Sequence, residues 1–238
     1  MSRHLSMEKY INAQVKYWEQ AKARIDIAED EKIHAPFVTI SREYGCGGYD
    51  LGKKIIEIIN ENYNSNPLWA AYDRQVLDKV MEDMGLSSKL AKTLTDDALK
   101  SMTNVIQTTF TKFPPQVAVY RKLAETIKML AANGNVIIVG RAGNVITRFM
   151  KGGYNVRVIA QMDYKVKNVM KNQNLSAREA EKLILANTER RNNYIREFVE
   201  FDVTDPGNYD IMINLSRINI DNAARLILEG MKFRGFLK

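Results

Sequence analysis

The sequence predicts a three-layer αβα domain in which a parallel sheet lies between two layers of helices. Three observations favour this class. Short β-branched or apolar stretches alternate with longer stretches of helical periodicity, which is typical of strand–helix–strand units. One short stretch, residues 136–139, is fully apolar, as expected for a parallel strand buried on both faces. The first strand also runs into a glycine-rich turn that opens a helix.

The composition of the 238 residues is that of a globular protein, with 45% hydrophobic and 26% charged residues. It excludes a disordered chain, a collagen-like fibre and a disulfide scaffold. Cys46 is the single cysteine, so no internal disulfide can form and a reducing, cytoplasmic location is expected. His4 and His34 add too few ligands for a zinc site. Neither a membrane-spanning apolar run nor the apolar core of a secretory signal is expected.

Positive charge is concentrated in one part of the chain. The formal net charge is +7, and residues 141–200 contain twelve basic and six acidic residues, so most of the excess lies there. Such an excess fits a polyanionic ligand, namely nucleotide phosphates, nucleic acid or an acidic membrane. A solvated, soluble surface explains it equally well.

Residues 1–35 are predicted to form an appendage, and residues 36–238 the main domain. The appendage places apolar residues on one face of a helix: Met7, Ile11, Val15, Trp18, Ala21 and Ile25. A short helix needs packing to be stable, so we expect this face to be buried on the main domain or in a homodimer. Trp18 is expected to anchor that packing rather than to contact a ligand.

The main domain is expected to contain five strands, at residues 37–41, 68–72, 136–139, 156–160 and 209–214. Helices are expected at 49–62, 73–84, 87–113, 116–132, 163–173, 176–200 and 219–230, with a short helix after residue 144. Asp73 is a candidate helix cap, Pro114-Pro115 ends one helix, and Asn133-Gly134 forms a turn before the third strand.

The turn after the first strand has four glycines in eight residues, at Gly45, Gly47, Gly48 and Gly52. Glycine lets backbone amides turn inward, and the following helix adds the positive end of its dipole. Together these features predict a nest for phosphates, formed by residues 45–50 and including Cys46, Tyr49 and Asp50. A tight turn without a ligand is the alternative. In this nest Cys46 is expected to be a small residue filling the turn, although a helix end can also lower the pKa of a thiol.

This turn differs from a standard phosphate-binding loop. When the glycines are aligned, Gly48 stands at the usual lysine and Tyr49 at the usual serine or threonine. Arg42 stands beside the loop and is a candidate to supply the missing positive charge. Asp50 is a candidate ligand for magnesium, and stabilisation of the helix dipole explains it equally well.

Several stretches together resemble the cytidylate kinase-like family, whose members are P-loop relatives of the nucleoside monophosphate kinases. These stretches are SREYGCGGYDLGKKI, AYDRQVL, VIIVGRAGNVI, TERRNNYIREF and GNYDIMINLSRINIDNAARLI, within residues 37–227. The resemblance implies a P-loop fold with strand order 2-3-1-4-5 and a helical lid at about residues 174–202. It also implies transfer of a phosphoryl group from ATP, with Mg²⁺, to a nucleoside monophosphate such as CMP.

The same resemblance suggests residues for the acceptor and the lid. Gly140-Arg141 is similar to the start of a Gly-Arg-Asp segment that contacts the monophosphate, with Ala142 in place of the Asp. Arg190 and Arg191 are similar to lid arginines that close over the triphosphate. From their place after the second strand, Asp73 and Arg74 are further acceptor candidates. Ion pairs, a helix cap and a solvated helix are the structural alternatives for these residues.

The sequence is compatible with three functions. The first is an ATP-dependent phosphotransferase acting on a nucleoside monophosphate. The second is a nucleotide-binding sensor or regulatory protein that has lost catalysis, which the changed loop and the appendage favour. Binding of nucleic acid is a weaker third, because the basic residues are not interleaved with stacking aromatics.

Overall fold

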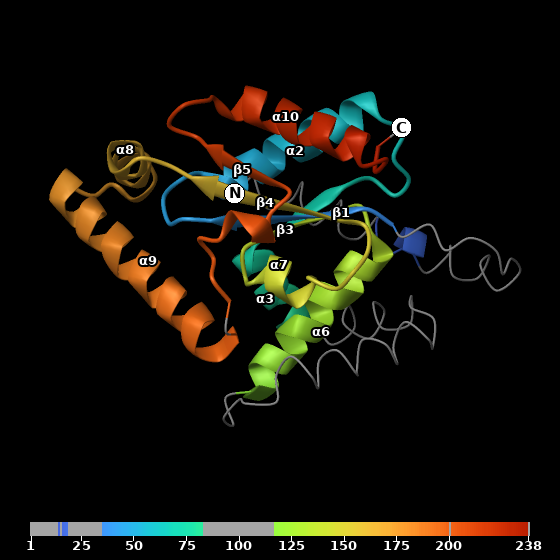
Figure 1. The fold of residues 1–238 in the computed structure, drawn as a ribbon, viewed down its shortest axis with the longest axis horizontal. Helices are drawn as coiled ribbons and strands as arrows, with labels where there is room; N and C mark the ends of the chain where they lie inside the picture. Colours follow the sequence, from blue (N-terminus) through green and yellow to red (C-terminus); the bar gives the residue numbers. More distant parts are fainter. Residues whose placement is uncertain (1–13, 15, 19–34, 83–116, 200, 238) are drawn as a thin grey trace, which may run out of the picture.

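A five-stranded parallel sheet forms the centre of the domain (Figure 1). The computed structural model describes residues 14, 16–18, 35–82, 117–199 and 201–237. The strands are β1 (Phe37–Arg42), β2 (Ala70–Tyr72), β3 (Val136–Val139), β4 (Gly153–Ile159) and β5 (Ile211–Asn214). Their order is β2-β3-β1-β4-β5, and every pairing is parallel. The predicted fold class and strand order are confirmed.

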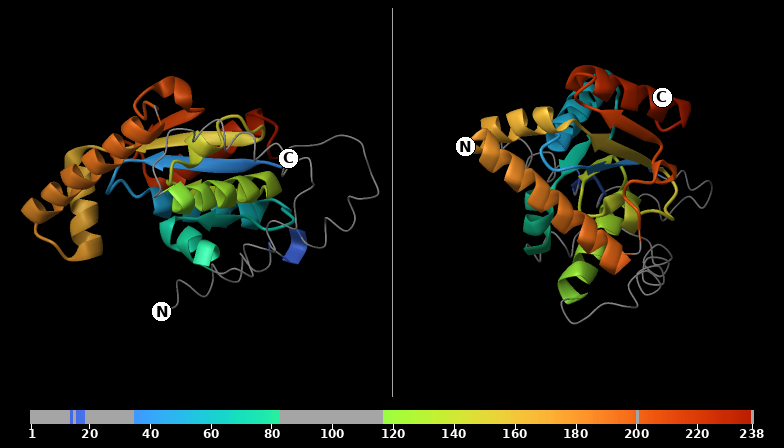
Figure 2. Two further views of the ribbon diagram at one scale, coloured as in Figure 1. Left: turned by 90° about the horizontal axis from the view of Figure 1, so that it is seen from below. Right: turned by 60° about the vertical axis from the view of Figure 1, so that its left-hand side comes forward.

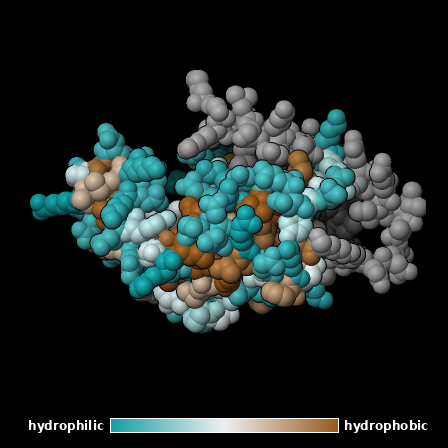
Figure 3. Space-filling model, turned by 90° about the horizontal axis from the view of Figure 1, so that it is seen from above, coloured by the Kyte–Doolittle hydropathy of each residue, from teal (hydrophilic) through white to brown (hydrophobic). Residues whose placement is uncertain are grey.

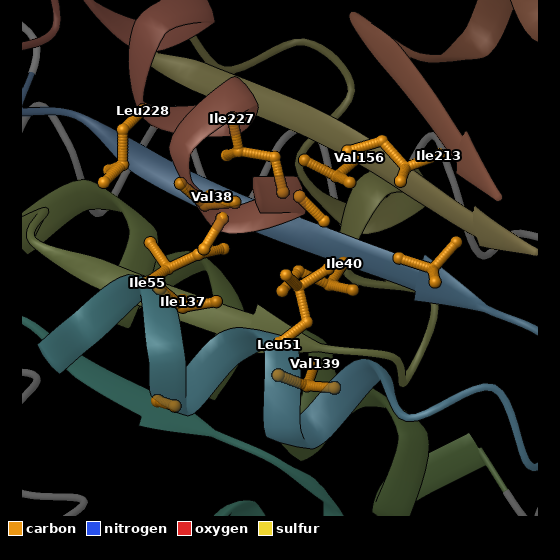
Figure 4. Close-up of a cluster of buried hydrophobic side chains, with 14 of the residues drawn as sticks. Val38, Ile40, Leu51, Ile55, Ile137, Val139, Val156, Ile213, Ile227 and Leu228 are labelled. Atoms are coloured by element: carbon orange, nitrogen blue, oxygen red, sulfur yellow. The ribbon is translucent and has the colours of Figure 1, made fainter. Parts of the chain in front are cut away.

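Helices cover both faces of the sheet. On one face lie α2 (Gly48–Asn62) and α10 (Ile220–Phe233), which share a buried core with alternate residues of the strands (Figure 4). On the other face lie α3 (Arg74–Glu82), α6 (Val117–Asn133) and the short α7 (Gly143–Ile146), over a second core. The sheet is therefore the middle of three layers.

The face around α10 also exposes apolar side chains among polar ones, with Leu226 and Phe233 on α10 itself (Figure 3).

A helical hairpin extends from one end of the sheet (Figure 2). It consists of α8 (Met162–Gln173) and α9 (Ala177–Val199), close to the two helices predicted there. Asn174 ends α8 in the left-handed region, with a φ of 54°, which suits asparagine better than most residues. A capping box starts α9, because Ser176 N donates to Glu179 at 2.9 Å and Glu179 N donates back to Ser176 Oγ at 3.4 Å. The short η1 (Pro206–Asn208) leads from the hairpin into β5.

Four strands differ in length from their predictions. β1 runs one residue further, to Arg42, and β5 begins two residues later, at Ile211. β4 begins at Gly153, before the predicted start, because Gly153 pairs with Phe37 and continues the ladder with β1. A Cβ at Gly153 would lie 2.8 Å from the Phe37 ring, so glycine is needed for this close approach. β2 is shorter, since only Ala70–Tyr72 pair with β3. The helix predicted at residues 87–113 lies outside the described residues.

The described part of the N-terminal appendage packs on the main domain. Gln14 is fully buried, and its Nε2 donates to the carbonyl oxygens of Leu68 at 2.7 Å and Asn135 at 2.8 Å. The Tyr72 hydroxyl donates to Gln14 Oε1 at 2.8 Å. Trp18 is buried in the core beneath α3 and α6, in agreement with its predicted packing role. The remaining residues of the predicted apolar face lie outside the described ranges.

Gln14→Ala is expected to lower the free energy of unfolding by about 2–3 kcal/mol. The substitution leaves the buried Tyr72 hydroxyl without its acceptor and the Leu68 carbonyl without its side-chain donor, and each unsatisfied group carries a desolvation cost. The Asn135 carbonyl keeps the amide of Ala70 at 3.2 Å. Urea unfolding of the full chain measures the effect. Lys16→Ala, at an exposed position of the same segment, is the matched control. A Gln14→Ala protein as stable as the control would show that this contact contributes nothing to the fold.

One lysine of α6 is buried without a partner. Lys128 is 2% exposed, and its Nζ makes no hydrogen bond within the described ranges. Burial lowers the pKa of Lys128 to about 8, although the charge of Glu125 acts in the opposite direction. The ammonium group therefore costs stability at neutral pH.

Lys128→Met is expected to stabilise the protein at pH 7 by on the order of 2 kcal/mol. An unfolded lysine keeps its proton up to its ordinary pKa of 10.5, whereas the folded one loses it near 8. The wild type thus gains stability as the pH rises from about 8 to 10.5, and the advantage of the variant shrinks over the same interval. Urea unfolding at several pH values, with the exposed Lys171→Met as control, measures this. A stabilisation that does not change with pH would exclude titration of Lys128 as its cause.

Candidate functional site

The glycine turn between β1 and α2 forms a backbone nest. Gly45 and Gly47 have φ values of 82° and 83°, which only glycine adopts without strain. Gly47 is the N-cap of α2, and no side chain caps the helix, so amides of its first turn remain available. Available amides at the positive end of a helix dipole are the features that bind phosphate.

Arg42 lies against Gly48, the residue that aligns with the lysine of a standard loop. A Cβ at Gly48 would lie 3.1 to 3.2 Å from the Cβ, Cγ and Cδ atoms of Arg42, so the arginine stem runs directly over Gly48. A Cβ at Gly140, after β3, would overlap Nη1 of Arg42, so the guanidinium ends at that glycine. Gly48 and Gly140 are therefore small because Arg42 lies against both.

Three guanidinium groups influence one another around this nest. Burial lowers the pKa of Arg42 to about 10, and the positive charges of Arg191 and Arg141 contribute to the same shift. Asp73 opposes it, but no described carboxylate forms an ion pair with Arg42. Burial likewise lowers the pKa of Arg191, which lies with its Cζ 5.1 Å from the centre of the Tyr44 ring. The positive charges of Arg42 and Arg191, which form no ion pair with a described carboxylate, favour an anionic ligand here.

Side chains of helix α8 contact the glycine turn, and the sequence patterns did not predict these contacts. Lys165 Nζ lies 2.9 Å from Glu43 Oε2 in a largely buried ion pair. Asn168 Nδ2 donates to the carbonyl oxygen of Gly45 at 2.7 Å, and Gln173 Nε2 donates to the Tyr44 hydroxyl at 2.7 Å. The hairpin and the nest are thus joined by side chains more than a hundred residues apart in sequence.

The remaining turn residues have local partners. Cys46 is fully buried, and burial raises the pKa of its thiol to about 11, so it fills the turn and is not activated. Tyr49 lies beside Lys53, whose Nζ is 5.0 Å from the centre of its ring. Asp50 forms an ion pair with Lys53 at 2.7 Å, in the first turn of α2. Asp50 therefore balances a neighbouring lysine at the edge of the nest.

The predicted acceptor residues all have partners within the protein. Asp73 Oδ1 accepts from the amide of Val76 at 3.0 Å, so Asp73 caps α3 and also lines the groove beside Arg42. Arg74 is 71% exposed and pairs with Asp78 at 3.5 Å. Arg141, with a φ of 55°, pairs with the same Asp78 at 3.3 Å. Asp78 thus pairs with two of the predicted cations. Its pair with Arg74 follows a local spacing of four residues that the sequence does display, whereas its pair with Arg141 joins residues 63 apart.

The two predicted lid arginines point in different directions. Arg191 lines the groove and faces Tyr44 of the glycine turn. Arg190 is exposed, and its Nη2 donates to Asn187 Oδ1 on the same helix. Adjacent residues on a helix lie about 100° apart, which explains why the turn meets only one of them.

An open groove of about 890 Å³ runs past the nest. Its lining includes Arg42, the turn, Asp73 and Arg191, together with parts of α2, α3 and α8. This volume falls in the range of small-molecule sites. In the ranges the structure describes, there is no group of three or more metal-binding side chains, and no helix long and apolar enough to cross a membrane.

Comparison with solved structures supports the architecture. A crystal structure of an uncharacterized protein from Eubacterium ventriosum ATCC 27560 matches 84% of this chain and 99% of its own, with 22% identity and a TM-score of 0.63. Shikimate kinase from Bacteroides thetaiotaomicron matches 83% and 98% with 14% identity and a TM-score of 0.44. A gluconokinase from Sinorhizobium meliloti 1021 matches 84% and 94% with 11% identity and a TM-score of 0.43. The first of these likenesses shows a shared fold.

No curated protein matches the sequence. A family model does match it, over residues 37–217, which include the nest, the hairpin and every strand of the sheet. The resemblance inferred from the glycine turn and the later segments is thereby confirmed, and the chain belongs to the cytidylate kinase-like family.

Proposed function

We propose that the protein transfers the γ-phosphoryl group of ATP to a nucleoside monophosphate, with CMP as the first candidate. One observation carries the proposal: the stem of Arg42 runs over Gly48 and its guanidinium reaches Gly140, which supports Arg42 as a substitute for the missing loop lysine. A positive charge is therefore present beside the nest although the lysine is absent from its usual position. Membership of a kinase-like family supports the same conclusion.

In this proposal each group near the nest has a defined task. The amides of residues 45–49 hold the donor phosphates, while Arg42 and Arg191 offset negative charge as it shifts during transfer. An oxygen of the acceptor phosphate forms a bond to the γ-phosphorus as the bond to the bridging oxygen breaks, and ADP leaves. The protein positions the two phosphates and neutralises their negative charge, so no general base is required.

Magnesium fits this site as a companion of the nucleotide. Mg²⁺ is usually held by substrate phosphates and one or two carboxylates rather than by a protein cage. Asp73 is the carboxylate that lines the groove and acts on the charge of Arg42, so it would hold the ion together with the phosphates. Bound Mg²⁺ would supply further neutralisation of phosphate charge.

A coupled assay with ATP, Mg²⁺ and a panel of nucleoside monophosphates tests the proposal. We expect ADP release that depends on one monophosphate, and phosphoryl transfer to it that can be followed by phosphorus NMR. ATP binding without transfer to any acceptor in the panel would contradict the proposal.

That last result would instead support a nucleotide-binding sensor. The observation favouring this second function is Tyr49, which stands where a standard loop has its magnesium-binding hydroxyl and lies beside Lys53. A sensor would retain the nest and lose only the chemistry. The same panel therefore separates the two functions.

A further inference from the structure

Arg157 is a buried arginine on the central part of the sheet. It lies in β4 opposite Ser41 of β1, and it is 7% exposed. Its neighbours Val156 and Val158 belong to the core beneath α2 and α10. Because side chains alternate along a strand, Arg157 points to the opposite face, on the side of α7.

The guanidinium of Arg157 has few partners. Its Nη1 donates to Ser41 Oγ at 2.8 Å. Its Nε is buried and has no hydrogen-bond acceptor, and no carboxylate forms an ion pair with it within the described residues. The Tyr209 hydroxyl lies 3.4 Å from the same Ser41 Oγ and 3.0 Å from the carbonyl oxygen of Val203. Three polar groups from β1, β4 and the segment before β5 therefore meet at one point.

Among the residues that the structure describes, no partner explains a charge at this position. A buried cation without a counter-charge is costly, and an apolar side chain would fit the strand without that cost. The other candidate arginines of the site have different surroundings. Arg74 and Arg141 share Asp78, and Arg42 and Arg191 face the groove beside the nest.

Ser41 and Arg42 are consecutive in β1, so their side chains leave the strand on opposite sides. Arg42 reaches the donor nest, and Ser41 contacts Arg157 on the other side. Transfer between two phosphates needs a second anion site close to the first. We propose that Arg157, with Ser41 and Tyr209, forms the subsite for the phosphate monoester of the acceptor. This inference rests on the proposed function for its identification of the ligand as the acceptor.

Methyl phosphate is a suitable probe, because it is a phosphate monoester without a nucleoside. In arginine side-chain NMR spectra of the full chain, the Nε–H signal of Arg157 is identified by its loss in Arg157→Lys. We expect methyl phosphate to shift this signal saturably, since a phosphate bound against the guanidinium changes the electrostatic surroundings of its Nε–H. Sodium chloride at equal ionic strength is the control. A signal that stays in place, or follows ionic strength alone, overturns the proposal.

Arg157→Met separates a binding role from a structural one. The variant removes the unpaired charge, so we expect its Tm to rise by about 2–4 °C. Its affinity for methyl phosphate should fall at least about tenfold, the scale of losing a charged hydrogen bond. ATP affinity should stay unchanged. Arg225→Met, at an exposed position of α10, controls for the loss of one positive charge.

The outcomes distinguish this inference from the proposed function. A lower Tm with unchanged affinity for methyl phosphate would make Arg157 a structural residue and overturn the inference. If wild type binds methyl phosphate at Arg157 but transfers no phosphoryl group to any monophosphate, the subsite stands and the proposed function fails. If transfer occurs and Arg157→Met leaves both the methyl phosphate affinity and the acceptor KM unchanged, the proposed function stands and the subsite fails.

Discussion

Arg191→Ala is expected to lower the turnover of phosphoryl transfer by at least about a hundredfold, the scale of losing a charged transition-state contact. Arg191 lines the groove and lies against Tyr44 of the turn, so its guanidinium would lie beside the donor phosphates of the proposed function. Arg42→Ala should have an effect of the same order, because it removes the cation that lies over Gly48. ATP affinity should fall much less in both variants, since the amides of the nest remain.

Arg190→Ala is the matched comparison for the lid. It removes the same charge from the same helix, but Arg190 is exposed and bonded to Asn187. We expect it to reduce turnover by less than about threefold, as for a screened surface charge. Turnover and ATP affinity are measured side by side for all three variants. Robust transfer that is indifferent to both Arg42→Ala and Arg191→Ala would refute the replacement of the loop lysine by arginine.

Gly47→Val is expected to abolish ATP binding while the helices stay folded. Gly47 has a φ of 83°, a conformation that a β-branched residue adopts only with strain. Its side chain would also enter the space where the nest holds phosphate. Calorimetric titration with ATP measures the loss, and far-ultraviolet circular dichroism checks the helices.

Gly235→Val provides the control for backbone strain. Gly235 has a φ of 70°, and a Cβ there would meet nothing within 4 Å. The valine substitution there therefore introduces a similar backbone strain at the C-terminal end of the domain, far along the chain from the nest. Equal ATP affinity in wild type and Gly47→Val would count decisively against the nest, whereas equal losses in both variants would point to general destabilisation.

The fold was largely predictable because its signals are local. The apolar run Val136–Val139 is buried throughout, as its composition indicates, and the glycine turn stands directly between β1 and α2. Asp73 caps α3 as predicted. β4 was predicted too short because Gly153 joins the sheet through its contact with Phe37, more than a hundred residues away.

The candidate site was predictable in outline only. Residues of the turn were identified, because glycine spacing and a helix start are properties of adjacent residues. Arg157 was missed although a charged residue within an apolar strand is a visible signal, since its meaning depends on what faces it. Glu43 and Lys165 were missed for a related reason: each is an ordinary surface residue type until the fold pairs them.

By itself the sequence determined the class of the domain, the order of its elements and the position of the glycine-rich turn. These follow from periodicity, glycine placement and caps, which act over a few residues. Only the tertiary structure decided which arginines act together: Arg42 and Arg191 converge on the nest, whereas Arg74 and Arg141 are held by Asp78. The physical reason is that a charge interacts with whatever lies within a few ångströms, and those neighbours come from strands and helices distant in sequence.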